Sequence, residues 1–268
     1  MDGTFATLIQ ELHRFAKNNQ FQRAVIGLSG GLNSSVVLLI AVRVFGPKNV
    51  VALLLPETGL TPEDDTAHAR ALAIHLGAEW HYQPINNFLV DYNFLSWDKT
   101  ETSNQNLKTR IRANLINNFA EAKNALVLGT ACKSDLDLGL GLPEGEFTGS
   151  VHPLGDLYKT EVQEIAGLLN LPNELVEKAP SRNLRPNQSD EDDLGAKWGK
   201  IDEILYQLDN GLDPENLIAK GMDSLLVHKI ARLAEQHKES KRSTQIITII
   251  RIPEAIKKAC EAEASSLN

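Results

Sequence analysis

The stretch Leu28-Ser29-Gly30-Gly31-Leu32-Asn33-Ser34-Ser35 decides the fold of this chain. It follows an apolar run, residues 23–29, that predicts a buried strand, and it leads into an apolar segment, residues 36–45, that predicts a buried helix. Its two glycines allow the backbone to approach a phosphate, its three serines add hydroxyl donors, and a helix N-terminus offers unpaired N–H groups. It is neither a Walker A loop nor a Gly-x-Gly-x-x-Gly loop. The alternatives are therefore a phosphate-binding loop of another type and a plain Gly/Ser connection before a helix.

Strands and helices alternate on both sides of this loop. We expect a mostly parallel sheet with helices on both faces, a doubly wound α/β fold, because strands and helices that alternate in this way build such sheets. Ligands bind beyond the carboxyl ends of the strands in such folds. We expect one domain over residues 1–252 and a helical or frayed tail over residues 253–268. The expected elements are strands at 50–57, 79–85 and 124–130, helices at 61–76 and 104–122, a loop at 139–155 and mainly helices from 158 onward.

Composition narrows the function classes. The 268 residues have a hydrophobic content of 42%, which suffices for a core, and a formal charge of −8, which argues against a nucleic-acid partner. No apolar run approaches the roughly 20 residues that span a bilayer. The two cysteines, Cys132 and Cys260, fit no disulfide framework and no cysteine-rich zinc site. We therefore expect a cytoplasmic protein that acts on a small molecule.

Several motifs together resemble one family. The loop resembles the SGGxDS signature of ATP pyrophosphatases, which grips the pyrophosphate released when a substrate is adenylated. Four further segments, in the same order along the chain, are similar to those of the ammonia-dependent NAD+ synthetases within that superfamily. These are Asn106-Leu-Lys-Thr-Arg110-Ile-Arg112, Gly129-Thr130-Ala-Cys-Lys133-Ser134-Asp135, residues 153–160 around Lys159, and residues 178–195, which match K-P-P-S-x-x-L-x-P-x-Q-T-D-E-D-E-L-G.

The resemblance implies an adenine-nucleotide alpha-hydrolase-like fold and a ligase that uses ATP and Mg²⁺. Its substrates would be deamido-NAD and ammonia, and it would act as a homodimer. Asp135 and Asn33 would hold the metal, and Lys159, Glu146 and Asp135 would be catalytic. The implied nucleotide and dinucleotide contacts are Ser29, Gly30, Gly31, Asn33, Ser34, Ser35, Thr130, Asn106, Arg110 and Ser181.

Acidic positions depart from the family pattern. Asn33 stands where the family has Asp, Asp135 where it has Glu, and Glu146 where it has Asp. An amide oxygen ligates Mg²⁺ more weakly than a carboxylate does, so we expect reduced activity. Two other functions stay open: adenylation of another carboxylate, which the altered segment 140–146 suggests, and nucleotide binding without catalysis, as a sensor or partner subunit. RNA thiolation fits poorly, because the net charge is negative and a catalytic cysteine pair is missing.

Overall fold

The computed structural model describes residues 2–176, 178, 180–242 and 244–249, so the expected tail at 253–268 lies outside the described residues. Its strands are β1 (Ala24–Gly27), β2 (Val50–Leu54), β3 (Glu79–Tyr82) and β4 (Leu126–Leu128). Its helices up to the sheet's last strand are α1 (Asp2–Asn18), α2 (Leu32–Phe45), η1 (Pro47–Asn49), α3 (Glu63–His75), α4 (Asn86–Asp91), η2 (Tyr92–Phe94) and α5 (Glu101–Lys123). The helices that follow are α6 (Lys133–Leu138), α7 (Lys159–Leu168), α8 (Asn173–Val176), α9 (Asp190–Leu194), α10 (Trp198–Asp209), α11 (Pro214–Ala219) and α12 (Ser224–Arg242).

The four strands form a parallel sheet in the order β3-β2-β1-β4. Ala24 of β1 lies level with Val50 of β2 on one side and with Leu126 of β4 on the other. The strands β1, β2 and β4 are short apolar runs, and nearly all of their residues are buried. Such runs are typical of strands that are covered on both faces.

Helices cover both faces of the sheet, as the sequence predicted. One apolar cluster joins the strands to α1, α2, α3 and α7, and a second cluster joins the opposite side chains of the strands to α5. Alternate residues of β1 divide between the clusters: Ala24 and Ile26 pack in the first, Val25 in the second. The doubly wound α/β fold is thereby confirmed.

The chain order creates a switch point between β1 and β4. From β1 the chain builds outward to β2 and β3, and it then returns to place β4 on the other side of β1. The connections that leave the carboxyl ends of β1 and β4 run in opposite directions, which opens a crevice there. The phosphate loop follows β1, and residues 129–135 follow β4, so both motifs meet at this crevice.

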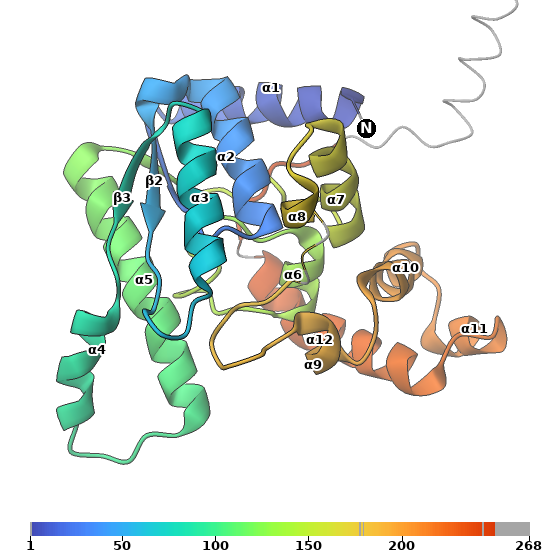
Figure 1. Cartoon of the computed structure of the whole chain (residues 1–268). Helices are drawn as coiled ribbons and strands as arrows, with labels where there is room; N and C mark the ends of the chain where they lie inside the picture. The colour runs from blue at the N-terminus through green and yellow to red at the C-terminus, as the bar shows by residue number, and fades with distance from the viewer. Residues whose placement is uncertain (1, 177, 179, 243, 250–268) are drawn as a thin grey trace, which may run out of the picture.

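The helices after α9 pack around a core of their own, which lies away from the strands in Figure 1. Trp198 and Ile201 of α10 pack there with Val227 and Ile230 of α12. Leu138 at the end of α6 belongs to the same cluster, so α6 joins this helical part to the sheet.

The structure contains features that the sequence did not predict. Val151 bridges to Leu128 and His152 bridges to Ile246, so the expected loop at 139–155 and the segment near residue 246 extend the sheet beyond β4. Single bridges have no periodic pattern, which explains why they were missed. The helices α4 and η2 were also missed, because they are short. Among the described residues, no helix is long and apolar enough to cross a membrane.

Candidate active site

A cavity of about 290 Å³ lies at the crevice between β1 and β4. The phosphate loop, the residues after β4, and the starts of α6 and α7 contribute to its lining. Residues 180–189, which we call the strap, supply another part of the wall, and Asp65 of α3 and Arg112 of α5 complete it. The cavity therefore gathers segments from most of the length of the chain.

The phosphate loop is folded by hydrogen bonds among its own serines. The Oγ atoms of Ser29 and Ser34 lie 3.1 Å apart, and the Gly31 N–H donates to Ser29 Oγ over 3.3 Å. Gly31 is the N-cap residue of α2, and no side chain caps that helix N-terminus. Gly30 has φ +80°, and a Cβ there would lie 2.1 Å from the Asp65 carbonyl oxygen, so only glycine fits. The loop thus presents open backbone N–H groups to the cavity, which is the arrangement that binds phosphate.

Asn33, Asp135 and Lys159 form a closed network beside this loop. Asn33 Nδ2 donates to Asp135 Oδ2 over 2.8 Å and to the Thr130 carbonyl oxygen over 3.0 Å. Lys159 Nζ lies 2.9 Å from Asp135 Oδ1 and donates to Asn33 Oδ1 over 3.3 Å. One positive charge balances one negative charge, and the amide of Asn33 links both.

Asp135 and Lys159 stabilise each other's charged forms. Burial alone raises the pKa of Asp135, but the neighbouring Lys159 charge and the hydrogen bond from the Cys132 N–H outweigh it, and the pKa falls below its usual value. Burial alone lowers the pKa of Lys159, but Asp135 raises it above its usual value. Burial raises the pKa of the Cys132 thiol, so this cysteine is an inert buried group beside the cavity.

Asp202 of α10 holds the first turn of α7 in place. The Lys159 N–H donates to Ser134 Oγ over 2.9 Å, and Ser134 Oγ donates to Asp202 Oδ1 over 2.6 Å. The Thr160 N–H donates to Asp202 Oδ2 over 2.8 Å. The helical part of the chain therefore fixes the direction in which Lys159 enters the cavity. Sequence reasoning gave Asp202 no role, and its contacts are too distant along the chain to leave a local signal.

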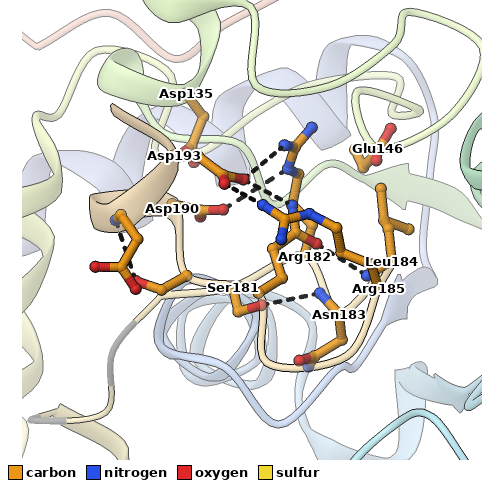
Figure 2. A network of polar contacts seen from close by, with 12 residues as sticks. Asp135, Glu146, Ser181, Arg182, Asn183, Leu184, Arg185, Asp190 and Asp193 are labelled. Atoms are coloured by element: carbon orange, nitrogen blue, oxygen red, sulfur yellow. Dashed lines mark hydrogen bonds and ion pairs between the residues drawn. The ribbon is translucent and has the colours of Figure 1, made fainter. Parts of the chain in front are cut away.

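The strap is anchored at both ends by acidic side chains. At its beginning, Asn183 Nδ2 donates to Asp65 Oδ2 over 3.1 Å, and Lys178 forms an ion pair with the same carboxylate. At its end, Arg185 pairs with Asp193 of α9, and Gln188 Nε2 donates to Asp193 Oδ2 over 3.1 Å. Figure 2 shows Arg185 of the strap beside Asp193 of α9.

Asp190 is the buried carboxylate of this group. Its Oδ1 atom is buried without a hydrogen-bond partner among the described residues and lies 3.7 Å from Arg182 Nε. Burial first, and then the negative charge of Asp135, raise the pKa of Asp190 to about 6, although Arg182 acts in the opposite direction. Figure 2 shows Arg182 pointing toward Asp190 and Asp193.

The structure brings most of the predicted site residues to one cavity and leaves others outside its lining. The lining contains Ser29, Gly31, Asn33, Ser34, Thr130, Asp135, Glu146, Lys159 and Ser181. Gly30 and Ser35 stand behind the loop, where the Ser35 hydroxyl donates to the Gly31 carbonyl oxygen. Asn106 and Arg110 lie along α5 outside the lining, and Arg110 is exposed.

Sequence reasoning gave no role to several charged residues of the lining. Arg112 is nearly buried and donates from Nε to the Leu55 carbonyl oxygen over 2.9 Å, and burial lowers its pKa despite the nearby Glu57 and Glu146. Asp65, Lys178, Arg182 and Asp190 also belong to the lining. Asp65 lies in the acidic start of a helix, and the other three lie in the matched segment 178–195. Their positions in these motifs did not reveal which side chains face the cavity.

A parallel doubly wound sheet, a Ser/Gly phosphate loop at its switch point and a Lys–carboxylate pair beside that loop define a nucleotide-binding protein of the ATP-pyrophosphatase type. The model of the NAD synthase family matches residues 4–245. The chain therefore belongs to the NAD synthase family.

Individual relatives agree with this assignment. The NH(3)-dependent NAD(+) synthetase of Archaeoglobus fulgidus is 40% identical over 187 residues, which are 70% of this chain and 76% of that protein. The enzyme of the same name from Chlorobaculum tepidum is 31% identical over 243 residues, 90% of this chain and 87% of the relative. The structure of the NH3-dependent NAD synthetase from Campylobacter jejuni, solved in complex with the nitrate ion, has a TM-score of 0.76 and 28% identity and covers 94% of this chain and 99% of its own.

Proposed function

We propose that this protein is an ammonia-dependent NAD+ synthetase, which converts deamido-NAD to NAD+ with ATP. The observation that carries the proposal is the placement of the phosphate loop, Lys159 and Asp135 around one cavity at the switch point of the sheet. Family membership and the names of the relatives support the same reaction.

The reaction has two steps. The nicotinate carboxylate of deamido-NAD attacks the α-phosphate of ATP, and pyrophosphate leaves, which gives an acyl-adenylate. Ammonia then attacks the acyl carbon, AMP leaves with the bonding electrons, and the nitrogen loses a proton. Adenylation is necessary because a free carboxylate has no leaving group that ammonia can displace.

The proposed tasks of the side chains are positioning and charge stabilisation. Ser29, Ser34 and the N–H groups around Gly31 hold the pyrophosphate, and Lys159 neutralises the charge that develops on it. Gly30 and Ser35 act indirectly, because they shape the loop from behind. Thr130 and Ser181 face the nucleotide from the opposite segments of the lining. Glu146 stands near the acyl group and the incoming ammonia.

The donor groups fit a Mg²⁺ ion that arrives with the nucleotide. Proteins commonly hold Mg²⁺ with one or two carboxylates and leave the remaining positions to phosphate oxygens and water. Asp135 Oδ1 contacts only Lys159 within the described part of the chain, and the Oδ1 atom of Asn33 is a second, weaker oxygen donor. When bound, the ion would neutralise charge on the leaving pyrophosphate. We expect Asn33 to weaken its binding and to slow the reaction.

We also propose a homodimer, with Asn106 and Arg110 of α5 contacting the dinucleotide at the interface. The residues before α5 support this proposal, because large apolar side chains are exposed there, including Phe94 and Trp97. We further propose a single domain over residues 1–252 and a cytoplasmic location, which the buried free thiol of Cys132 supports.

Product analysis by mass spectrometry tests the proposed reaction. Purified protein is incubated with Mg-ATP, deamido-NAD and ammonium chloride, beside an Asn33→Asp variant. NAD+ and AMP from the unaltered chain are the expected products. No product from either protein, with ATP still bound, would contradict the proposal.

A second candidate is a paralogue that binds nucleotide without making NAD+. The closed Asn33–Asp135–Lys159 network favours it, because the network is neutral and satisfied without any ligand. A related possibility is a different carboxylate substrate, since residues 140–146 differ from the family pattern beside the cavity. Product from Asn33→Asp alone would indicate a disabled enzyme, whereas product with other acids alone would indicate changed specificity.

A further inference from the structure

Arg182 brings a positive charge to the cavity from the strap. It lines the same cavity as Ser29, Asn33 and Lys159, and 29% of its side chain is exposed. It follows Ser181 in the matched segment, at a position that the family pattern leaves open. The reaction described above has given it no task.

Its contacts within the described part of the chain are long. Arg182 Nε lies 3.7 Å from Asp190 Oδ1, and its Nη2 atom lies 3.8 Å from Asp193 Oδ2. Neither distance is a hydrogen bond. The Nε atom is buried without a partner among these residues, and so is Oδ1 of Asp190. The planar guanidinium of Arg182 therefore lies at the cavity with most of its N–H donors making no hydrogen bond to the described residues.

The other cations of the lining are engaged more closely. Lys159 lies 2.9 Å from a carboxylate oxygen, and Lys178 is in direct contact with another carboxylate. Arg112 donates to a backbone carbonyl oxygen over 2.9 Å. Arg182 differs from all three, because it makes no hydrogen bond within the described part of the chain and can leave its present position without breaking one.

The nearby acids hold Arg182 only through long ion pairs. Asp193 already pairs with Arg185 and accepts a hydrogen bond from Gln188. Asp190 Oδ1 lies 3.7 Å from Arg182 Nε, slightly beyond hydrogen-bond distance, so this ion pair is long. Arg182 is therefore held loosely at its place in the cavity wall.

We propose that Arg182 binds the phosphates of ATP by exchanging its two long ion pairs for hydrogen bonds to phosphate oxygens. A guanidinium suits this task, because its fork of N–H groups matches two phosphate oxygens at once. Asn33 removes a negative charge from the neighbouring metal site, so less of the phosphate charge is neutralised by a metal there. The proposal rests on the proposed function in that ATP is taken as the ligand.

Binding measurements on matched variants test this proposal. Isothermal titration with Mg-ATP, pyrophosphate and adenosine compares the unaltered chain with Arg182→Gln, Arg182→Lys and Arg185→Gln. We expect Arg182→Gln to weaken the binding of ATP and pyrophosphate roughly 10- to 100-fold and to leave adenosine binding within about twofold, because only charge-assisted bonds to phosphate are lost. Arg185→Gln is the control, since Arg185 shares the strap but does not line the cavity.

Several outcomes would overturn the proposal. Equal losses of affinity for adenosine and ATP would mean that Arg182 only shapes the strap. An equal loss of ATP affinity in Arg185→Gln would mean that the effect comes from the general charge of the strap and not from a contact of Arg182 with phosphate. No ATP binding by the unaltered chain would also overturn it. If Arg182→Gln does not fold, Arg182→Lys decides, with ATP binding expected to weaken roughly 5- to 10-fold because the fork is lost. An unaltered chain that binds ATP but makes no NAD+ would refute only the proposed reaction.

Discussion

At the scale of single residues, position 33 determines how the site behaves without a ligand. The Asn33 amide donates to Asp135 and to the carbonyl oxygen of Thr130. An aspartate there could donate to neither, its charge would face the Asp135 carboxylate and the Thr130 carbonyl oxygen, and Lys159 would be shared between two carboxylates. Asparagine therefore stabilises the free protein, whereas aspartate would favour a bound cation.

We expect Asn33→Asp to lower the stability of the ligand-free protein and to increase its response to Mg²⁺. Two hydrogen bonds are replaced by repulsion, so the free energy of unfolding should fall by about 1–3 kcal/mol in EDTA. Added MgCl₂ should raise the melting temperature of the variant more than that of the unaltered chain. Asn33→Ala is the control, because it loses the same bonds without gaining a charge. A variant with equal stability and no response to Mg²⁺ would contradict the geometry.

Asp190 gives the stability of the protein a predictable pH dependence. Burial raises its pKa from 3.8 to about 6, so between these values the folded chain keeps a proton that the unfolded chain releases. Stability from this group is therefore present below the unfolded pKa and is lost as the pH rises through the folded one. Asp190→Asn removes the titration. Urea unfolding from pH 4 to 7 should show the variant gaining up to about 3 kcal/mol relative to the unaltered chain, and a difference that is flat with pH would refute this.

At the scale of elements, the turn after β1 depends on close contact with α3. Gly30 has φ +80° and touches the Asp65 backbone, whereas Gly195, a left-handed residue with φ +86° at the end of α9, has nothing within 4 Å of an added Cβ. Gly30→Ala should therefore cost more than the roughly 1 kcal/mol of left-handed strain that Gly195→Ala should cost, and it should also abolish ATP binding. Chemical denaturation and ATP titration of both variants check this. Similar losses in the two would show that the contact with α3 is unimportant.

The elements that the sequence predicted are those whose signals are local. The turn from β1 into α2 combines an apolar strand, two glycines and a long apolar helix, and all of these are adjacent in the sequence. The parts that were missed depend on contacts between distant residues. Asp202 contacts Ser134, 68 positions away in the sequence, and Asn183 contacts Asp65, 118 positions away. No periodic pattern in the sequence predicts such pairs. The lining by Thr130 and Lys159 was predicted only through the family resemblance.

At the scale of the whole molecule, the sheet and the later helices form one support for the site. The phosphate loop follows β1, α6 with Asp135 follows β4, and α10 fixes the start of α7 through Asp202. The end of α6 closes against α12, where the His237 ring fills the space beside Gly139. The single domain over residues 1–252 stays a proposal, and these contacts between the sheet and the later helices are the reason for making it.

The exposed apolar side chains before α5 predict the assembly of the molecule. Phe94 is 82% exposed and Trp97 is 64% exposed, and both lie between α4 and α5, near the helix that carries Asn106 and Arg110. Burial against a second copy would remove this apolar surface from water, which is favourable. Light scattering should therefore give a mass twice the 29.5 kDa of the chain.

The variant Phe94→Gln/Trp97→Gln should shift that dimer toward monomer at micromolar concentration, because the aromatic groups supply much of the contact area. Leu225→Gln is the matched control, since Leu225 is 83% exposed on α12 and remote from this surface in sequence. We expect the control to stay dimeric. Because deamido-NAD is proposed to bind at the interface, the double variant should lose affinity for the dinucleotide while keeping its affinity for ATP. An unaltered chain that is monomeric would refute the dimer. A double variant that stays dimeric would mean that the second copy binds at another surface.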